Sequence, residues 1–172
     1  MTRIFDNIHS DLGSHLQQSL QISDRMDVAV GYFNLRGWAA FDDLVKKKVA
    51  AGAAGPVVRI LIGMVMTGPQ QETLEALQAV VDGTPRPDAD ANAARERKAH
   101  LLDQLRTQLM RGLPTNADRA ALQSLRDLLA QGAVEIKVFT RRPLHGKTYI
   151  CHRQDLNNPI TGFVGSSNLT AP

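Results

Sequence analysis

In the stretch DVAVGYFNLRGWAAFDDLVKKKVAAGAAGPVVRILIG (Asp27–Gly63), two short apolar runs flank an amphipathic segment, and this order sets the expected fold. The runs Asp27–Phe33 and Val57–Gly63 are rich in Val, Ile and aromatic residues and predict buried strands. Between them, Asn34–Gly37 predicts a turn, and Trp38–Ala51 predicts a helix because its apolar residues recur at helical spacing. Strand, helix and strand in this order predict a right-handed βαβ unit with parallel strands.

Helix signals lie on both sides of this unit. Ahead of it, Ser10 is positioned to cap a helix with a leucine at every fourth residue. These leucines are Leu12, Leu16 and Leu20. After the unit, apolar spacing predicts a helix over Gln70–Val81 and another from Asn92 to Gly112. The Pro-containing stretch Gly83–Ala91 separates them and predicts a surface excursion of the same domain.

A further helix and strand complete the middle of the chain. Thr115 and Asp118 form a pair of the capping-box type, and Gly132 marks the end of the helix that they start. The leucines expected to face the core are Leu122, Leu125, Leu128 and Leu129. Val134–Thr140 alternates apolar and polar residues as a strand does. Together these elements predict an α/β fold: a mixed, largely parallel sheet with helices on both faces.

Composition narrows the class of protein. A chain of 172 residues that is 43% hydrophobic and 22% charged is typical of one soluble globular domain. The single cysteine, Cys151, excludes an intrachain disulfide and argues against a thiolate zinc site. There is no apolar run of membrane-spanning length, and the N-terminus lacks the order of a signal peptide. These features predict a cytoplasmic protein with no membrane partner.

The stretch LHGKTYICHRQDLNNPITGFVGSSNLT (Leu144–Thr170) holds the candidate chemistry. It predicts two short strands joined by a polar loop. Because side chains alternate along a strand, His145 and Lys147 share one face of their strand. By the same rule, Ser166 and Asn168 share a face of theirs. Four groups able to hold or attack a phosphoryl group are thus expected at two strand ends.

The pattern His145-x-Lys147, followed by Gly165-Ser166-x-Asn168, resembles the HxK and GSxN motif of the phospholipase D superfamily. Within it, the run into GFVGSSNLT resembles the PLD-like nucleases, including domains found beside bacterial helicase modules and metal-independent restriction nucleases. The two motifs together are more specific than either alone, and they cover under a fifth of the chain. The resemblance implies a phospholipase D-like α/β/α sandwich.

The chain departs from the family pattern in three places. His152 stands where the family usually has an Asp, and the nearest acid is Asp155. The loop before GSSN is longer than in the most compact members. Family members also usually continue with an acidic residue and at least one strand after the second motif, whereas this sequence stops at Pro172. We therefore expect residues 1–172 to be a single, C-terminally truncated domain, with a helicase module as a candidate neighbour.

The resemblance also implies a mechanism. His145 would form a covalent phosphohistidine, which water later hydrolyses. Lys147 and Asn168 would stabilise the charge on the phosphoryl oxygens, and Ser166 could add a hydroxyl donor. Such a scheme needs no metal and no cofactor.

A second histidine has to protonate the leaving oxygen, because one imidazole cannot lie both behind the phosphorus and beside the leaving group. The chain has a single HxK pattern, and single-motif members of the family pair two subunits. We therefore expect a homodimer through the HxK face. Strand alternation places His152 on the opposite face, so it is expected to be a satisfied core or surface histidine. Tyr149 and Cys151 share the parity of His145 and either line the site or pack.

Charge supports a polyanionic substrate. The net charge is +3, and residues 134–172 carry five Lys or Arg against two acids. Arg141 and Arg142, just before His145, read as a solvated turn on charge alone but as phosphate-positioning residues beside an HxK motif. The first reading is a DNA nuclease. The second is a non-catalytic nucleic-acid-binding or dimerisation module, and the third, ranked lowest, is a phospholipid hydrolase.

Overall fold

The computed structural model describes residues 11–63, 115–139, 144, 146–166 and 169, with six isolated positions between 92 and 103. Eight helices and strands have defined bounds within these residues. In chain order they are α1 (Leu12–Gln21), β1 (Arg25–Val30), α2 (Leu35–Ala50), β2 (Val58–Ile62), α5 (Asn116–Ala130), β3 (Val134–Val138), β4 (Thr148–His152) and β5 (Ile160–Val164).

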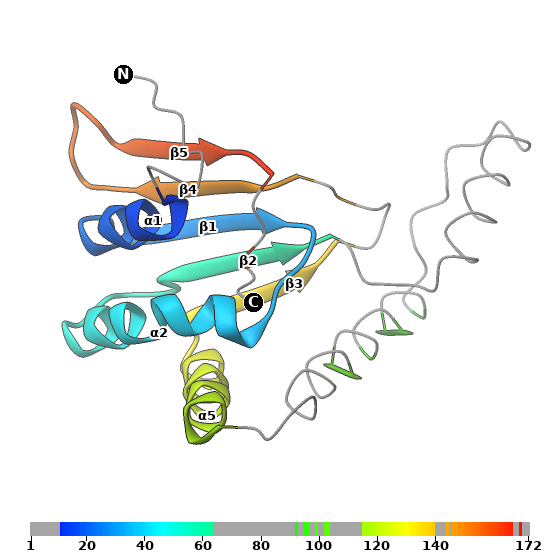
Figure 1. The fold of residues 1–172 in the computed structure, drawn as a ribbon. Helices are drawn as coiled ribbons and strands as arrows, with labels where there is room; N and C mark the ends of the chain where they lie inside the picture. The colour runs from blue at the N-terminus through cyan, green and yellow to red at the C-terminus, as the bar shows by residue number, and fades with distance from the viewer. Residues whose placement is uncertain are drawn as a thin grey trace, which may run out of the picture.

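The five described strands form one mixed sheet in the order β3-β2-β1-β4-β5 (Figure 1). β1 pairs with β2 in parallel, and β2 pairs with β3 in parallel. β4 is antiparallel to both β1 and β5. The α/β class and the parallel β1-α2-β2 unit are therefore confirmed. The sheet is only half parallel, because the last two strands join it as an antiparallel hairpin.

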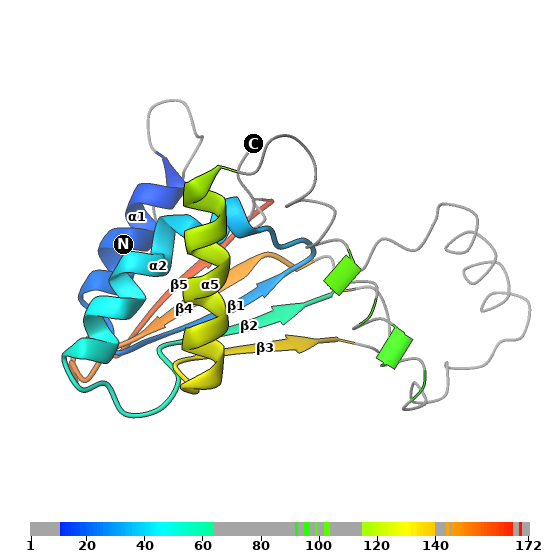
Figure 2. The same ribbon diagram turned by 90° about the horizontal axis from the view of Figure 1, so that it is seen from below.

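The three described helices, α1, α2 and α5, lie against one face of the sheet. Seen from below, all three cover the same side of the strands (Figure 2). On the other face, no helix with defined bounds occurs among the described residues. The expectation of helices on both faces is thus met on one face only within the described part of the chain.

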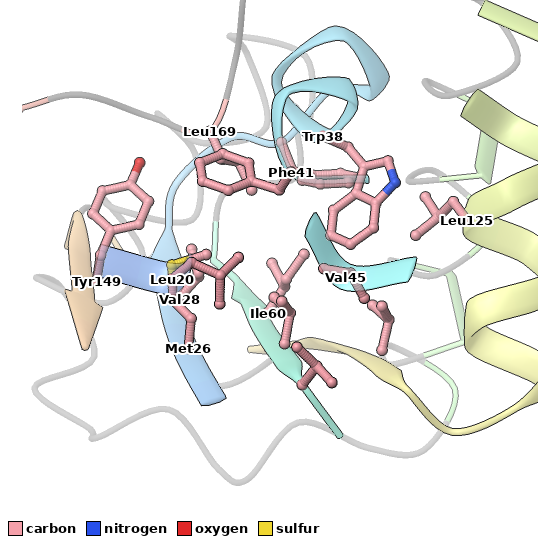
Figure 3. Packing of buried hydrophobic residues seen from close by; sticks show 14 of the residues in the cluster. Leu20, Met26, Val28, Trp38, Phe41, Val45, Ile60, Leu125, Tyr149 and Leu169 are labelled. Carbon is pink, nitrogen blue, oxygen red and sulfur yellow. The ribbon is translucent and has the colours of Figure 1, made fainter. Parts of the chain in front are cut away.

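Alternate residues of the strands build the core on the helix-covered face. On β1 the residues at even positions, Met26, Val28 and Val30, are buried, while their neighbours are half-buried. Trp38 and Phe41 of α2 lie in the same cluster (Figure 3). Burying apolar area stabilises by about 25 cal/mol per Å², so this face supplies most of the hydrophobic stabilisation.

A buried carboxylate ties two of the helices together. Asp42 of α2 accepts hydrogen bonds from Trp38 Nε1 at 3.1 Å and from Ser124 Oγ of α5 at 2.7 Å. Lys46 of α2 forms an ion pair with the same carboxylate. These partners satisfy a group that would be costly to bury alone.

The helix starts differ from the sequence expectations by one to three residues. Asp11, rather than Ser10, caps α1: its side chain accepts from the backbone N–H groups of Gly13 and Ser14. Ser10 lies outside the described residues. Helix α2 begins at Leu35, because Asn34 acts as its cap and accepts from the Gly37 N–H at 2.7 Å. The expected turn at residues 34–37 is the first turn of that helix.

Helix α5 begins with the expected capping box. The Asp118 N–H donates to Thr115 Oγ1, and the Thr115 N–H donates to the Asp118 carboxylate, each at 3.1 Å. Gly132 follows the helix with a positive φ of 71°, which glycine adopts without strain. Leu125 and Leu128 face the core as expected. Leu129 does not, because its side chain is 39% exposed.

The remaining expectations concern the middle of the chain. The expected helix over Gln70–Val81 and the excursion over Gly83–Ala91 lie outside the described residues. Within the expected helix from Asn92 to Gly112, each of the six described positions is helical. These positions are Asn92, Arg95, Glu96, Ala99, Leu102 and Asp103.

Candidate active site

The two motif segments meet at one edge of the sheet. Because β4 runs antiparallel to its neighbours, it begins at the edge where β1, β2, β3 and β5 end (Figure 1). Thr148, the first residue of β4, lies opposite Ala29 of β1 and Val164 of β5. Lys147, just before β4, and Ser166, just after β5, are therefore delivered to the same edge. The carboxyl ends of parallel strands are the usual place for a ligand site in open α/β sheets.

A backbone hydrogen bond joins the two segments directly. The Gly165 N–H donates to the Lys147 carbonyl oxygen at 3.1 Å. Lys147 is half-buried, whereas Ser166 is exposed. The pairing of β4 with β5 thus continues for one residue into both motifs and sets their separation.

The chain before HxK is held against the end of β2. The Leu144 N–H donates to the Gly63 carbonyl oxygen at 3.2 Å. A Cβ at Gly63 would overlap the Leu144 side chain and lie 2.8 Å from its carbonyl oxygen. Glycine is therefore required for this close approach. The apolar pattern of residues 57–63 placed Gly63 at the end of a predicted strand, but it did not indicate that Leu144 would pack against this glycine.

The chain after GSSN is held against the end of β1. Leu169 forms a parallel bridge with Phe33, and its carbonyl oxygen accepts from the Asn34 N–H at 3.1 Å. The Leu169 side chain is buried in the core cluster, as Figure 3 shows. Both motif segments are thus anchored on described residues at the ends of β1, β2 and β5.

The expected site residues divide into two groups. Lys147 and Ser166 are described and lie at this edge. His145, Asn168, Arg141 and Arg142 lie outside the described residues. The covalent neighbours of His145, Leu144 and Gly146, are described. Gly146 and Lys147 precede β4 instead of belonging to it, so the expected strand begins later than the HxK motif.

His152 is satisfied by a partner on the neighbouring strand. Its Nε2 lies 2.9 Å from the Asp27 carboxylate of β1. On β4, Tyr149 and Cys151 are buried, while Thr148, Ile150 and His152 are half-buried on the opposite face. The expectation that His152 has a partner is therefore confirmed, and it lies on the face opposite Tyr149 and Cys151. Its position relative to His145 lies outside the described residues. The carboxylate beside His152 comes from β1.

Asp27 is the centre of a charged cluster. Arg59 of β2 donates to both of its carboxylate oxygens, at 2.7 and 2.6 Å, and Arg25 Nε lies 3.1 Å from Oδ1. Partial burial opposes ionisation of Asp27, but hydrogen bonds from Arg59 and His152 and the two arginine charges outweigh it. The pKa of Asp27 is therefore below its ordinary value. The only sequence signal for this cluster was an acid at the start of an apolar strand.

Tyr149 and Cys151 belong to the core and do not line the edge. Both side chains are buried with the helix-covered cluster. Burial raises the pKa of Tyr149 to about 12 and also raises the pKa of the Cys151 thiol. Both groups are consequently neutral near pH 7, and packing is the reading that the structure supports.

The described residues contain no group of three or more His, Cys, Asp or Glu arranged to hold a metal ion. None of the described helices has the length and apolar character needed to cross a membrane. No protein-family model matches the sequence, and no curated protein matches it.

Proposed function

We propose that this chain is a metal-independent phosphodiesterase, a PLD-like nuclease that cuts DNA through a phosphohistidine intermediate. The observation that carries the proposal is the hydrogen bond between the Gly165 N–H and the Lys147 carbonyl oxygen. It joins Lys147 of the HxK motif to Gly165 of the GSxN motif at one edge of the sheet, although 17 residues separate them in the sequence. A shared site is what the chemistry of the two motifs requires.

In the proposed first step, a His145 imidazole nitrogen attacks phosphorus while the bond to the leaving oxygen breaks. The partner subunit's His145 gives its proton to that oxygen. Lys147 and Asn168 stabilise the charge on the non-bridging oxygens, and Ser166 adds a hydroxyl donor. In the second step water attacks phosphorus, the P–N bond breaks and the partner's imidazole takes the water proton.

Two chains supply the two histidines of this scheme, so the active unit is a homodimer. Arg141 and Arg142 lie four and three residues before His145, and they contribute positive charge for the flanking phosphates. The HxK and GSxN groups could act on any phosphodiester. DNA is proposed in preference to a phospholipid because residues 134–172 carry more basic than acidic side chains.

The test is cleavage of single- and double-stranded DNA in excess EDTA by the wild-type protein and by His145→Ala, after light scattering has shown both to be dimers. We expect EDTA-resistant cutting that His145→Ala abolishes. His15→Ala on α1 is the matched control and should cut like the wild type. A well-folded wild-type dimer that binds DNA without cutting it would support the binding-module reading instead.

A further inference from the structure

The face of the sheet opposite the three helices carries a groove. We call this face the open face; its residues alternate with the core residues along the strands. A cavity of about 290 Å³ lies on it, over β1, β2, β3 and the start of β4. Its apolar floor includes Ala29, Leu61 and Ile150, and its charged rim is formed by Asp27, Arg59, Glu135 and Lys137.

Asp27 holds two arginines in place, Arg59 of the rim and the neighbouring Arg25. Asp27 accepts from Arg59, and Arg25 and His152 lie against the same carboxylate. A guanidinium has five N–H donors, and the Asp27 contacts occupy only two of those on Arg59. The Arg59 and Arg25 side chains are 43% and 35% exposed. Asp27 thus orients two planar cations that remain partly exposed, and a guanidinium suits phosphate oxygens.

The charge along the described open face favours an anionic ligand. Its cations are Arg25, Arg59 and Lys137, and its acids are Asp27 and Glu135. Both acids already lie beside cations: Asp27 contacts the arginines, and Glu135 lies 3.6 Å from the Lys137 ammonium. Lys137 is 76% exposed. Three cations against two acids leave the described open face with one excess positive charge when His152 is neutral. The side chains of all three cations are at least partly exposed.

The groove also leads to the candidate active site. Thr148 lines it and is the residue after Lys147. Arg59 lies on β2, four residues before Gly63, which follows the strand. Four residues of extended chain correspond to about 13 Å between Arg59 and Gly63.

We infer that this groove binds the single nucleic-acid strand being cut, a few nucleotides from the scissile phosphate. Arg59, Arg25 and Lys137 contact phosphates, and the apolar floor of Ala29, Leu61 and Ile150 receives a sugar and base. A cavity of about 290 Å³ is close to the lower end of the volumes of small-ligand pockets, so it can receive part of one strand but cannot enclose a duplex. The inference rests on the proposed function, because it assigns a substrate-binding surface to the same site.

The experiment measures binding of a fluorescent single-stranded DNA 12-mer over a range of salt concentrations. His145→Ala serves as the background, so that the DNA is not cut. Arg59→Gln and Lys137→Gln are each expected to weaken binding about fivefold to tenfold and to reduce the salt slope by about 0.7. Glu135→Gln removes an acid from the rim and is expected to tighten binding.

Arg126→Gln is the matched control. It removes the same charge from an exposed side chain of α5, on the helix-covered side, and should bind as the background does. If Arg59→Gln and Lys137→Gln bind the 12-mer like Arg126→Gln, the inference is overturned. Stronger binding of a duplex than of the single strand, equally sensitive to both variants, would overturn the assignment to one strand.

Two checks separate this inference from the function on which it rests. Melting curves of each variant show whether loss of the Arg59 contact to Asp27 unfolds the chain. If Arg59→Gln unfolds, the binding affinity of Lys137→Gln decides whether the groove binds DNA, because the Lys137 side chain is exposed. Wild-type protein that cuts DNA while the groove variants bind normally refutes the groove alone. Wild-type protein that neither cuts nor binds DNA refutes both proposals.

Discussion

The two faces of the sheet are built from the same strands and differ in nearly every property. On β2, Ile60 is buried beneath the helices, while the next residue, Leu61, is half-buried on the open face. At the outer strand, Val164 is 84% exposed on the open face. Since burial sets hydrophobic stabilisation, one face holds the fold together and the other is free to bind.

The carboxylates of the two faces show the same division. Asp42 is buried and has partners on two helices, so its role is to join α2 to α5. Asp27 is partly exposed and has partners on β1, β2 and β4. A charge beneath the helices stabilises packing, whereas a charge on the open face organises a surface.

The largest effect is expected from truncating the core on β2. Ile60→Ala should lower the free energy of unfolding by about 2–5 kcal/mol, because it leaves a cavity under the helices. Leu61→Ala, one residue along, should cost about 1 kcal/mol or less. Urea denaturation of both variants measures the difference. Equal losses would mean that the open face is covered in solution.

The next effect is expected at the close approach beside the candidate site. Gly63→Ala should destabilise the protein by about 1–3 kcal/mol, because the added Cβ overlaps Leu144. It should also lower DNA cleavage, since the chain before HxK is displaced. Gly162→Ala on β5 is the control: a Cβ there meets nothing within 4 Å. It should be neutral or stabilise by up to about 1 kcal/mol, and melting and cleavage assays separate the two variants.

A smaller effect is expected from the charged cluster of the open face. Asp27→Asn should lower stability by about 1–2 kcal/mol at pH 7, because two arginines lose a shared carboxylate. The pKa of Asp27 is lowered, so its contribution is present above the ordinary value of 3.8 and is lost as pH falls through the lowered pKa.

Denaturation between pH 7 and pH 2 tests this sign. The wild type should lose stability over the acid range more steeply than Asp27→Asn, which lacks the titrating group. Asp43→Asn removes an exposed carboxylate of α2 and serves as the control. This variant should lose stability on acidification as steeply as the wild type does. Identical acid profiles for the wild type and Asp27→Asn would contradict the cluster.

The smallest effect is expected at the outer end of the open face. Val164→Lys should change stability by less than about 0.5 kcal/mol, because the side chain is almost fully exposed. A charge on an edge strand also opposes edge-to-edge pairing, so the variant should aggregate less during heating. Calorimetry with light scattering measures both quantities. A loss above about 1 kcal/mol would show that this end of the open face is covered.

Local signals in the sequence were good guides to local structure. The capping box at Thr115 and the strand-helix-strand order of Asp27–Gly63 were confirmed, because caps and hydrophobic periods act within a few residues. The start of α2 was placed too late. Asn34 is both a turn former and a good helix cap, and the pattern alone favoured the turn.

The candidate site was only partly predictable. The two motifs were visible in the sequence, but their meeting depends on β4 and β5 pairing as an antiparallel hairpin beside β1. The Asp27–His152 contact spans 125 residues, and the Gly63–Leu144 contact spans 81. No local pattern encodes partners at such separations.

Four features could be read from the order of the amino acids: the α/β class, the parallel unit around α2, the HxK and GSxN motifs and the burial parity of β4. These depend on residue type and on periods of two or 3.6 residues, which any short window contains. The half-parallel sheet, the edge that joins Lys147 to Gly165 and the open face with its arginine cluster became visible only in the folded chain. Such features arise when distant strands choose their neighbours, and that choice is made by packing over the whole sheet.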